Sequence, residues 1–433
     1  MTVDNNSPEI DEGRDYLGYR EALNLVYSGI CPVGTEEIPI EHAVGRIIAE
    51  DAAAVVDNPL SDVSFKDGFA VKSEDVDLAS PQHTVRLRVI GSGFAGSPFK
   101  GTVAAGSAVK ICSGSPIPPG ADAVVSGEFC EEVASEVYVS ANAEKGRNVL
   151  HAGEDVKSGA IIAGKDTVLL PGTLGLMAAA GITRTPVYRR PKAAVIAVGD
   201  EVVAPGEHLR TGQLYASNLV TISAWLTGFG ITHTTAVIGD NQEAIQREIR
   251  DLLSGTDTIL TSGGAWGSER DLVVGTLETL GWHKIFHHVR MGPGKGIAFG
   301  IWEGKPVFCL PGGPASNEMA FLQFALPGLM RLGGQLTHPL RTARAKLTET
   351  LTSRHLAWTE FKDATLSRDS AGNYMVTPYQ HKSRLQSIAT ATCLICIPEG
   401  TESLQAGEVV TVQLLAPPDH VSPGTGHHYG SQQ

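Results

Sequence analysis

The spacing of hydrophobic positions divides the chain into regions with different predicted structures. Apolar residues with helical spacing run from Leu17 to Tyr27, and Gly29 ends this helix. Between about residues 59 and 147, short apolar runs are separated by glycine and proline, which predicts a small β-rich module. The runs are 85–90, 108–112, 123–125 and 137–139. More short strands and a helix at 174–180 follow.

Residues 191–335 alternate between strand-like and helix-like segments. Strands are predicted at 193–198, 232–238, 258–261 and 307–310, and helices at 217–227, 241–253, 271–280 and 315–330. Such alternation is typical of a parallel sheet covered by helices on both faces. This region is therefore predicted to be an α/β domain.

In the last part of the chain the apolar runs are again short and strand-like, and this pattern predicts a small β-barrel over 336–417. Its strands are expected at 343–347, 361–366, 374–376, 394–397 and 409–415. Cys393 and Cys396 form a CxxC pair inside an apolar run, which favours a buried strand over a zinc site. The Pro-, Gly- and His-containing tail at 418–433 is predicted to be disordered.

The charge and hydropathy of the chain argue against nucleic acid and membranes as binding partners. The chain carries 34 Lys and Arg against 47 Asp and Glu, a net charge of −13, so phosphate backbones and anionic membranes would be repelled. It has no apolar run of about 18 residues, which a membrane-spanning helix needs. The N-terminus is acidic and polar, unlike a signal peptide. We therefore expect a cytoplasmic protein that binds neither nucleic acid nor membrane.

Polar and glycine-rich turns follow the predicted strands of the α/β region. Ligands of open parallel sheets bind at the carboxyl ends of the strands. Those ends carry Asp200 and Glu201, then Asp240, then Ser262-Gly263-Gly264, then Pro311-Gly312-Gly313-Pro314, and Asp271 begins a helix nearby. Carboxylates there suit Mg²⁺, and glycine turns before helices present N–H groups to phosphate. Each motif alone is more often an ordinary turn, but together they predict a Mg²⁺-dependent site for a phosphorylated small molecule.

Several blocks between about residues 16 and 415 carry a family resemblance. Residues 59–71, P-L-S-D-V-S-F-K-D-G-F-A-V, are similar to a family pattern P-x-F-D-N-S-A-M-D-G-Y-A-V. Further matching blocks stand in family order at 111–124, 146–155, 199–201, 212–218, 262–264 and 310–314. The chain thereby resembles the molybdopterin molybdenumtransferase family, which includes bacterial MoeA and the E domain of gephyrin.

The resemblance implies a multidomain, elongated homodimer. Its domains would be a dimerisation and linker domain (15–60 with 147–190), an inserted β-rich domain (61–146), a molybdopterin-binding-like α/β domain (191–335) and a C-terminal β-barrel (336–417). The active site would lie between the α/β domain and the β-rich domain of the partner subunit. The implied reaction takes molybdate and adenylylated molybdopterin as substrates, needs Mg²⁺ and releases AMP.

The resemblance also implies roles for individual residues. Asp67, Glu201, Asp240 and Asp271 fall on the family's functional acids, and the last three of these would bind the metal. The implied substrate-binding residues are Ser113, Ser262, Gly263, Gly264, Lys295, Pro311, Gly312, Pro314 and Ser383. For Asp155 a structural and a functional role are equally compatible with the pattern.

Other positions depart from the family pattern where molybdate is expected to bind. Trp266 replaces a small hydroxyl residue, Gly292 a lysine, Gly296 a proline, Gly313 an asparagine and Trp358 an arginine. Molybdate is a dianion, and each charged hydrogen bond lost would cost about 1.5–3 kcal/mol.

Three functions therefore remain open. The first is molybdenum insertion, with His381, Lys382 and Arg384 restoring positive charge. The second is a repurposed relative that acts on another nucleotide- or phosphate-linked substrate without molybdate. The third is a non-catalytic binding or scaffold protein.

Overall fold

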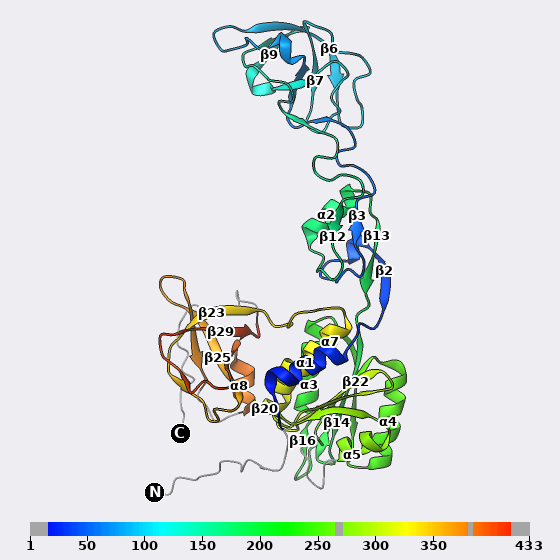
Figure 1. The fold of residues 1–433 in the computed structure, drawn as a ribbon, viewed down its shortest axis with the longest axis vertical. Coiled ribbons are helices and arrows are strands. Elements are labelled where there is room, and N and C mark those ends of the chain that lie inside the picture. The colour runs from blue at the N-terminus through cyan, green and yellow to red at the C-terminus, as the bar shows by residue number, and fades with distance from the viewer. Residues whose placement is uncertain (1–15, 265–271, 380–383, 417–433) are drawn as a thin grey trace. The chain divides into compact units, whose positions relative to one another are not determined.

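The computed structural model describes residues 16–264, 272–379 and 384–416 (Figure 1). The chain forms two compact units. Unit 1 comprises Met1–Gly34 and Tyr188–Gln433, and unit 2 comprises Thr35–Val187. Within the described ranges, no helix is both long enough and apolar enough to cross a membrane.

The α/β part of unit 1 contains a six-stranded sheet in the order β17-β14-β18-β22-β21-β19. The strands are β14 (Lys192–Val198), β17 (Thr232–Ile238), β18 (Thr258–Ser262), β19 (His283–His287), β21 (Ala298–Trp302) and β22 (Lys305–Leu310). The first four in the order are parallel, whereas β21 pairs antiparallel with both of its neighbours, β22 and β19. The parallel arrangement predicted from the sequence is therefore confirmed for β14, β17, β18 and β22, while β21 and β19 were not predicted. Glu303 and Gly304, with φ of 49° and 78°, make the two-residue hairpin that reverses the chain between β21 and β22.

Helices cover both faces of this sheet, as predicted (Figure 1). Ala193, Val195 and Ala197 of β14 pack into one core, while Ala194 and the residues alternating with it pack into the other. The first core is completed by α1 (Tyr19–Gly29), α3 (Ser217–Gly228), α6 (Pro314–Ala320) and α7 (Leu326–Leu332). The second core is completed by α4 (Gln242–Gly255) and α5 (Leu272–Thr279). Burial on both faces explains why the inner strands β14 and β22 are almost continuously apolar.

The helix predicted at 315–330 is three helical segments in the structure. α6 ends at Ala320, a π-helical turn, η4, spans Phe321–Ala325, and α7 starts at Leu326. Pro327 lies in the first turn of α7, where its missing N–H needs no partner. Inside one continuous α-helix that proline would remove a hydrogen bond, and a π-helical turn is one way to accommodate it.

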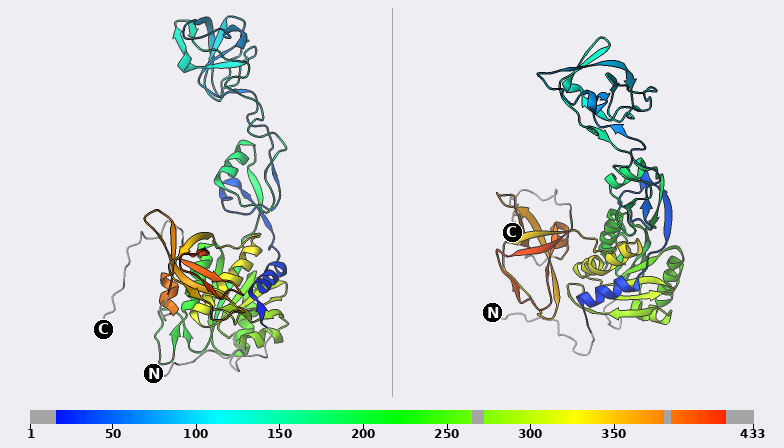
Figure 2. Two further views of the ribbon diagram at one scale, coloured as in Figure 1. Left: turned by 60° about the vertical axis from the view of Figure 1, so that its left-hand side comes forward. Right: turned by 45° about the horizontal axis from the view of Figure 1, so that its top comes forward.

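The C-terminal part of unit 1 is a closed β-barrel in the order β25-β26-β23-β29-β27, with β27 pairing back to β25 (Figure 2). Its strands are β23 (Thr342–Leu347), β25 (Thr359–Arg368), β26 (Tyr374–Pro378), β27 (Cys393–Ile397) and β29 (Val409–Leu414), and α8 covers Arg384–Thr390. β20 (Val289–Gly292) pairs with β25 on the outside, and β1 (Leu17–Gly18) pairs with β20. Cys393 is buried in β27, and this burial raises the pKa of its thiol to about 12, which confirms the predicted buried strand.

Unit 2 has two separate sets of core residues. The β-rich part is a six-stranded sheet in the order β8-β5-β7-β6-β10-β9. These strands are β5 (Gly68–Val71), β6 (Val85–Gly93), β7 (Ser107–Ile111), β8 (Ala123–Ser126), β9 (Cys130–Val133) and β10 (Glu136–Val139). The other part contains β2 (Thr35–Pro39), β3 (Ala52–Ala53), β12 (Ile161–Ala163), α2 (Pro171–Ala179) and β13 (Arg184–Tyr188) around Ile48, Leu169 and Met177. The exact domain boundaries stay a prediction.

Candidate active site

Four strand ends of the α/β sheet lie level at one edge. Val198 of β14 is in register with Ile238 of β17. Ala197 is in register with Ser262 of β18, which in turn pairs with Leu310 of β22. The turns that follow these strands therefore emerge side by side. The structure thus brings together the strand-end groups that the sequence indicated: Glu201, Asp240, Ser262, Gly263, Gly264, Pro311, Gly312 and, at the start of α6, Pro314.

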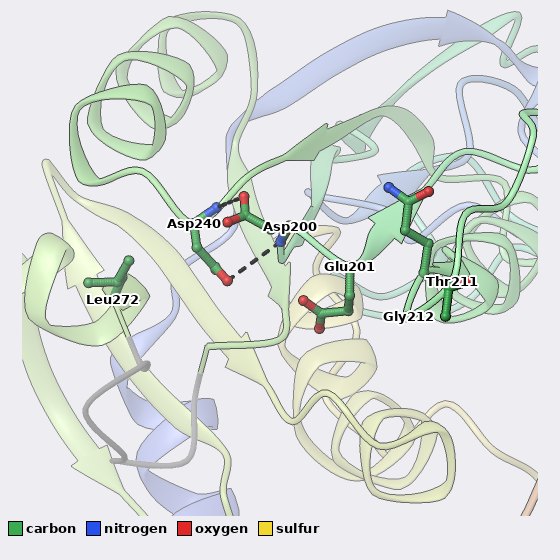
Figure 3. A pocket seen from close by; sticks show the side chains of 7 residues that line it. Asp200, Glu201, Thr211, Gly212, Asp240 and Leu272 are labelled. Carbon is green, nitrogen blue, oxygen red and sulfur yellow. Dashed lines mark hydrogen bonds between the residues drawn. The ribbon is translucent and has the colours of Figure 1, made fainter.

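A pocket of about 590 Å³ opens at this edge (Figure 3). It is lined by Asp200, Glu201, Thr211, Gly212, Gln213, Asp240 and Leu272. Glu201 and Asp240 are exposed, so their carboxylates are accessible to a ligand. The backbone N–H of Leu214 donates to the carbonyl of Glu201 (2.8 Å). This bond holds the segment that contains Thr211 and Gln213 next to the end of β14. Their place in the pocket was not singled out from the sequence.

Asp200 joins two of the strand ends. Its Oδ1 accepts the backbone N–H of Asp240 at 2.9 Å, and its own backbone N–H lies 3.5 Å from Oδ2 of Asp240 (Figure 3). A Cβ at Gly239 would lie 2.6 Å from Oδ1 of Asp200, so a larger residue there would displace this carboxylate. Asp200 therefore fixes the turn that carries Asp240, a role that sequence analysis missed because the bond links residues 40 positions apart.

Two side-chain amides support the glycine-rich turns. Nδ2 of Asn218 donates to Oγ of Ser262 (3.1 Å) and to the carbonyl of Gly312 (2.8 Å). Nδ2 of Asn317 donates to the same Ser262 oxygen (3.0 Å) and to the carbonyl of Pro311 (2.8 Å). Ser262 and Asn317 are buried, so the hydrogen bond between them fixes the two turns from the protein interior. A direct contact between Ser262 and the substrate stays a prediction.

The turn after β18 requires its first glycine. Gly263 has φ of 96°, and a Cβ there would lie 2.6 Å from the carbonyl oxygen of Val198. This close approach places the backbone of the turn against the end of β14. The N–H of Gly263 donates to the Leu310 carbonyl (3.1 Å), and the next residue, Gly264, has no side chain to cover its own N–H from an anionic ligand.

Lys295 lies on the turn after β20 and is near Trp358. Nζ of Lys295 is 5.8 Å from the centroid of the Trp358 ring, within range of a cation–π interaction. Tyr16 and His355 contact the same ring, with centroid distances of 5.8 and 5.4 Å. At the position where the family pattern has an arginine, the structure therefore has Trp358. Its ring belongs to an aromatic cluster and lies within cation–π range of the Lys295 ammonium.

Helix α6 supports both of these regions. It follows the Pro311–Gly313 turn directly, and a Cβ at Gly294 would lie 3.3 Å from the backbone nitrogen of Ala320. Its Glu318 is buried and accepts a hydrogen bond from Nε1 of Trp225 (2.9 Å). Burial raises the pKa of Glu318 to about 7; the Trp225 hydrogen bond opposes this shift and Asp363 adds to it. Sequence analysis missed Asn317 and Glu318, although two adjacent polar residues in an apolar helix are a readable signal.

Asp67 and Ser113 meet in unit 2. The backbone N–H of Ser113 donates to Oδ1 of Asp67 at 2.7 Å, which joins the turn before β5 to the turn after β7. Both side chains are exposed. Asp155, also in unit 2, accepts a hydrogen bond from Nδ2 of Asn58 at 3.2 Å.

Three residues singled out from the sequence, Trp266, Asp271 and Ser383, lie outside the described residues, as do His381 and Lys382. In the part of the chain that the structure describes, no group of three or more His, Cys, Asp or Glu side chains is placed to hold a metal ion. The described metal-ligand candidates are therefore two, Glu201 and Asp240.

Three family models match successive parts of the chain. Residues 17–181 match the MoeA N-terminal region (domain I and II). Residues 194–331 match the probable molybdopterin binding domain, and residues 344–415 match the MoeA C-terminal region (domain IV).

Individual proteins agree with these models over most of their length. The chain is 32% identical to a protein named molybdopterin molybdenumtransferase 2 of Mycobacterium tuberculosis, over 87% of this chain and 94% of that protein. It is 29% identical to the molybdopterin molybdenumtransferase of Haemophilus influenzae, over 88% of this chain and 94% of that protein. The crystal structure of a molybdopterin biosynthesis MoeA protein from Pyrococcus horikosii superposes with a TM-score of 0.78 at 32% identity, covering 93% of this chain and 100% of that one. Together with the strand-end site, these matches show that the chain belongs to the molybdopterin molybdenumtransferase (MoeA) family.

Proposed function

We propose that this protein is an enzyme of molybdenum cofactor biosynthesis that inserts molybdate into adenylylated molybdopterin and releases AMP. The observation that carries the proposal is the edge of the α/β sheet, where exposed carboxylates and glycine-rich turns lie side by side. This combination suits a diphosphate whose charge must be neutralised while one of its bonds breaks. Relatives named molybdopterin molybdenumtransferase over most of the chain support the choice of substrates.

The residues at this edge fit Mg²⁺. This ion prefers oxygen ligands, keeps several waters, and is usually held by one or two carboxylates together with substrate phosphates. Glu201 and Asp240 supply two accessible carboxylates on adjacent strand ends, and Asp271 is our proposed third. When bound there, Mg²⁺ would withdraw charge from the phosphoanhydride oxygens.

The chain's own groups have separate roles in this proposal. The backbone N–H groups of Gly264, Gly312 and Gly313 bind the phosphate oxygens, with Asn218 and Asn317 keeping the two turns in position. Lys295 donates to molybdate, and Ser383, which lies outside the described residues, is our proposed second group for binding this oxyanion. Asp240 is held at the correct strand end by Asp200.

We further propose that the active form is a cytoplasmic homodimer. In it, Asp67 and Ser113 of one subunit complete the strand-end site of the partner subunit. Both side chains are exposed, and the carboxylate of Asp67 is already fixed by the Ser113 N–H, as a preorganised contact requires. Purified protein should therefore sediment as a dimer, and a monomer would contradict this arrangement.

Complementation tests the proposal in cells. A host that lacks its own molybdenumtransferase should regain molybdoenzyme activity when it expresses this chain, and the Glu201→Gln variant should fail to restore it. Failure of the wild-type chain, when it accumulates as folded protein, would count against molybdenum insertion.

A second function is favoured by the Lys295–Trp358 contact. With an aromatic ring where the family pattern has arginine, and with Gly292 in place of a lysine, the site holds a dianion less strongly. In this second candidate the protein cleaves a nucleotide-linked phosphoester without using molybdate. Release of AMP that is unaffected by added molybdate would distinguish it from molybdenum insertion.

A further inference from the structure

The turn that precedes β5 in unit 2 is fixed by its backbone. β4 (Val63–Ser64) leads into it and β5 begins at Gly68. Hydrogen bonds hold it to three other segments: Ser64 N to Ser115 O (2.8 Å), Gly114 N to Ser64 O (2.8 Å), Phe65 N to Asn148 O (2.8 Å) and Gly127 N to Asp67 O (2.9 Å). The turn also contains a bond of its own, from Oγ of Ser64 to the carbonyl of Lys66 (2.5 Å).

This rigid turn exposes three successive side chains, Phe65, Lys66 and Asp67. Phe65 is 61% exposed. Single exposed apolar residues are common on protein surfaces. This one differs because it adjoins Asp67, the candidate catalytic acid, and because Oγ of Ser113 donates to the Phe65 carbonyl (3.4 Å) while Ser113 N binds Asp67. A side chain on a backbone that is already ordered loses less entropy when it binds a ligand.

Phe65 and Lys66 are also where this chain departs from the family pattern. That pattern has alanine and methionine at these two positions, so the turn has gained an aromatic ring and a positive charge. Unit 1, in contrast, lacks the family's positive charges at Gly292 and Trp358. An aromatic ring stacks on a flat heteroaromatic base, and a lysine ammonium binds phosphate.

We infer that Phe65 and Lys66 bind the nucleotide end of the substrate, with Phe65 stacked on the base and Lys66 paired with the phosphate. The inference deepens the proposed function, on which it rests for the identity of the nucleotide as the adenylyl group. It makes these two residues determinants of nucleotide affinity in this chain, beside the Asp67 carboxylate. Phe65 would contact only the base and Lys66 only the phosphate, so a substitution at each residue tests one contact alone.

The test measures, by calorimetry on the full-length protein, the dissociation constants of AMP, adenosine and ribose 5-phosphate. Phe65→Ala should weaken AMP and adenosine about tenfold and leave ribose 5-phosphate unchanged. Lys66→Met should weaken AMP and ribose 5-phosphate about fivefold, leave adenosine unchanged and reduce the salt dependence of AMP binding. Both variants restore the residues of the family pattern, so the fold should tolerate them.

Matched controls use residues away from this turn. Phe129→Ala removes another exposed aromatic ring of unit 2, and Lys165→Met removes another exposed lysine of unit 2. Neither should change any of the three constants. Sedimentation of each variant shows whether the subunit assembly is intact.

Several results would overturn the inference. The first is a wild-type protein that does not bind AMP. The second is a variant that loses the same affinity for AMP, adenosine and ribose 5-phosphate. The third is a Phe65→Ala variant that changes the oligomeric state but not the dissociation constant of AMP. The last result would identify Phe65 as a subunit contact. The proposed function fails separately, when wild-type protein binds AMP but releases none from adenylylated molybdopterin. AMP release that both variants leave unchanged, with AMP affinity also unchanged, would overturn only the inference.

Discussion

Two regions of unit 1 differ in how well they match the chemistry expected of the family. The strand-end edge keeps exposed carboxylates at Glu201 and Asp240, with glycine-rich turns beside them. The region around Lys295 has instead exchanged a cation for the Trp358 ring, on which Tyr16 and His355 pack. Under the proposed function, the region proposed to bind the metal and the diphosphate keeps the family's residues, while the region proposed to bind molybdate has changed.

The largest expected effect comes from the intact region. Glu201→Gln should lower the rate of AMP release about a hundredfold or more, because a ligand of the metal that stabilises the developing charge is lost. Because the Glu201 side chain is exposed, the substitution should leave the fold intact, and circular dichroism checks this. Glu207→Gln, a nearby exposed acid, is the control. Equal activity of the two variants would remove Glu201 from the site.

Helix α6 supports both regions, and its Glu318 makes stability depend on pH. Burial raises the pKa of this carboxyl from 4.5 to about 7, so between these values the folded protein binds more protons than the unfolded one. The free energy of unfolding should therefore fall as pH rises through this range, by on the order of 3 kcal/mol. Glu318→Gln should lack this loss while keeping the Trp225 bond. Urea denaturation at pH 5 and pH 7.5 compares the two, and parallel pH profiles would contradict the assignment.

Asn317 connects α6 to the strand ends. Asn317→Ala would leave the Pro311 carbonyl without its side-chain donor and would remove one of the two amides that donate to Ser262, which should cost about 2 kcal/mol. Thermal denaturation measures the loss. The exposed Asn373→Ala variant, whose amide binds only Asp369 in the described contacts, should lose clearly less. A stable Asn317→Ala variant would show that the turns keep their position without this amide.

The smallest effect is expected in the altered region, where it sharpens the comparison most. Trp358→Arg restores a guanidinium beside Lys295 and should lower the molybdate concentration needed for half-maximal AMP release by about tenfold. Trp358→Phe keeps an aromatic ring and should not. The same response from both variants would show that Trp358 is not near the oxyanion.

The sequence predicted those features that depend on local pattern. The strands β14, β17, β18 and β22 follow from their apolar runs, and their parallel arrangement then places Glu201, Asp240 and the glycine turns at one edge. Features that depend on distant partners were not predictable. The Asp200 bond to Asp240 and the Trp225 bond to Glu318 join residues 40 and 93 positions apart. The reversed strand β21 and its neighbour β19 were not predicted, because a Glu-Gly hairpin is a weak signal inside an otherwise alternating α/β pattern.

The most direct test of the account is AMP release from adenylylated molybdopterin by purified protein with Mg²⁺, measured with and without molybdate. The account predicts that AMP is released, that release needs Mg²⁺, and that molybdate accelerates it. No AMP under either condition, from folded protein, would contradict the central claim that this chain is a molybdopterin molybdenumtransferase.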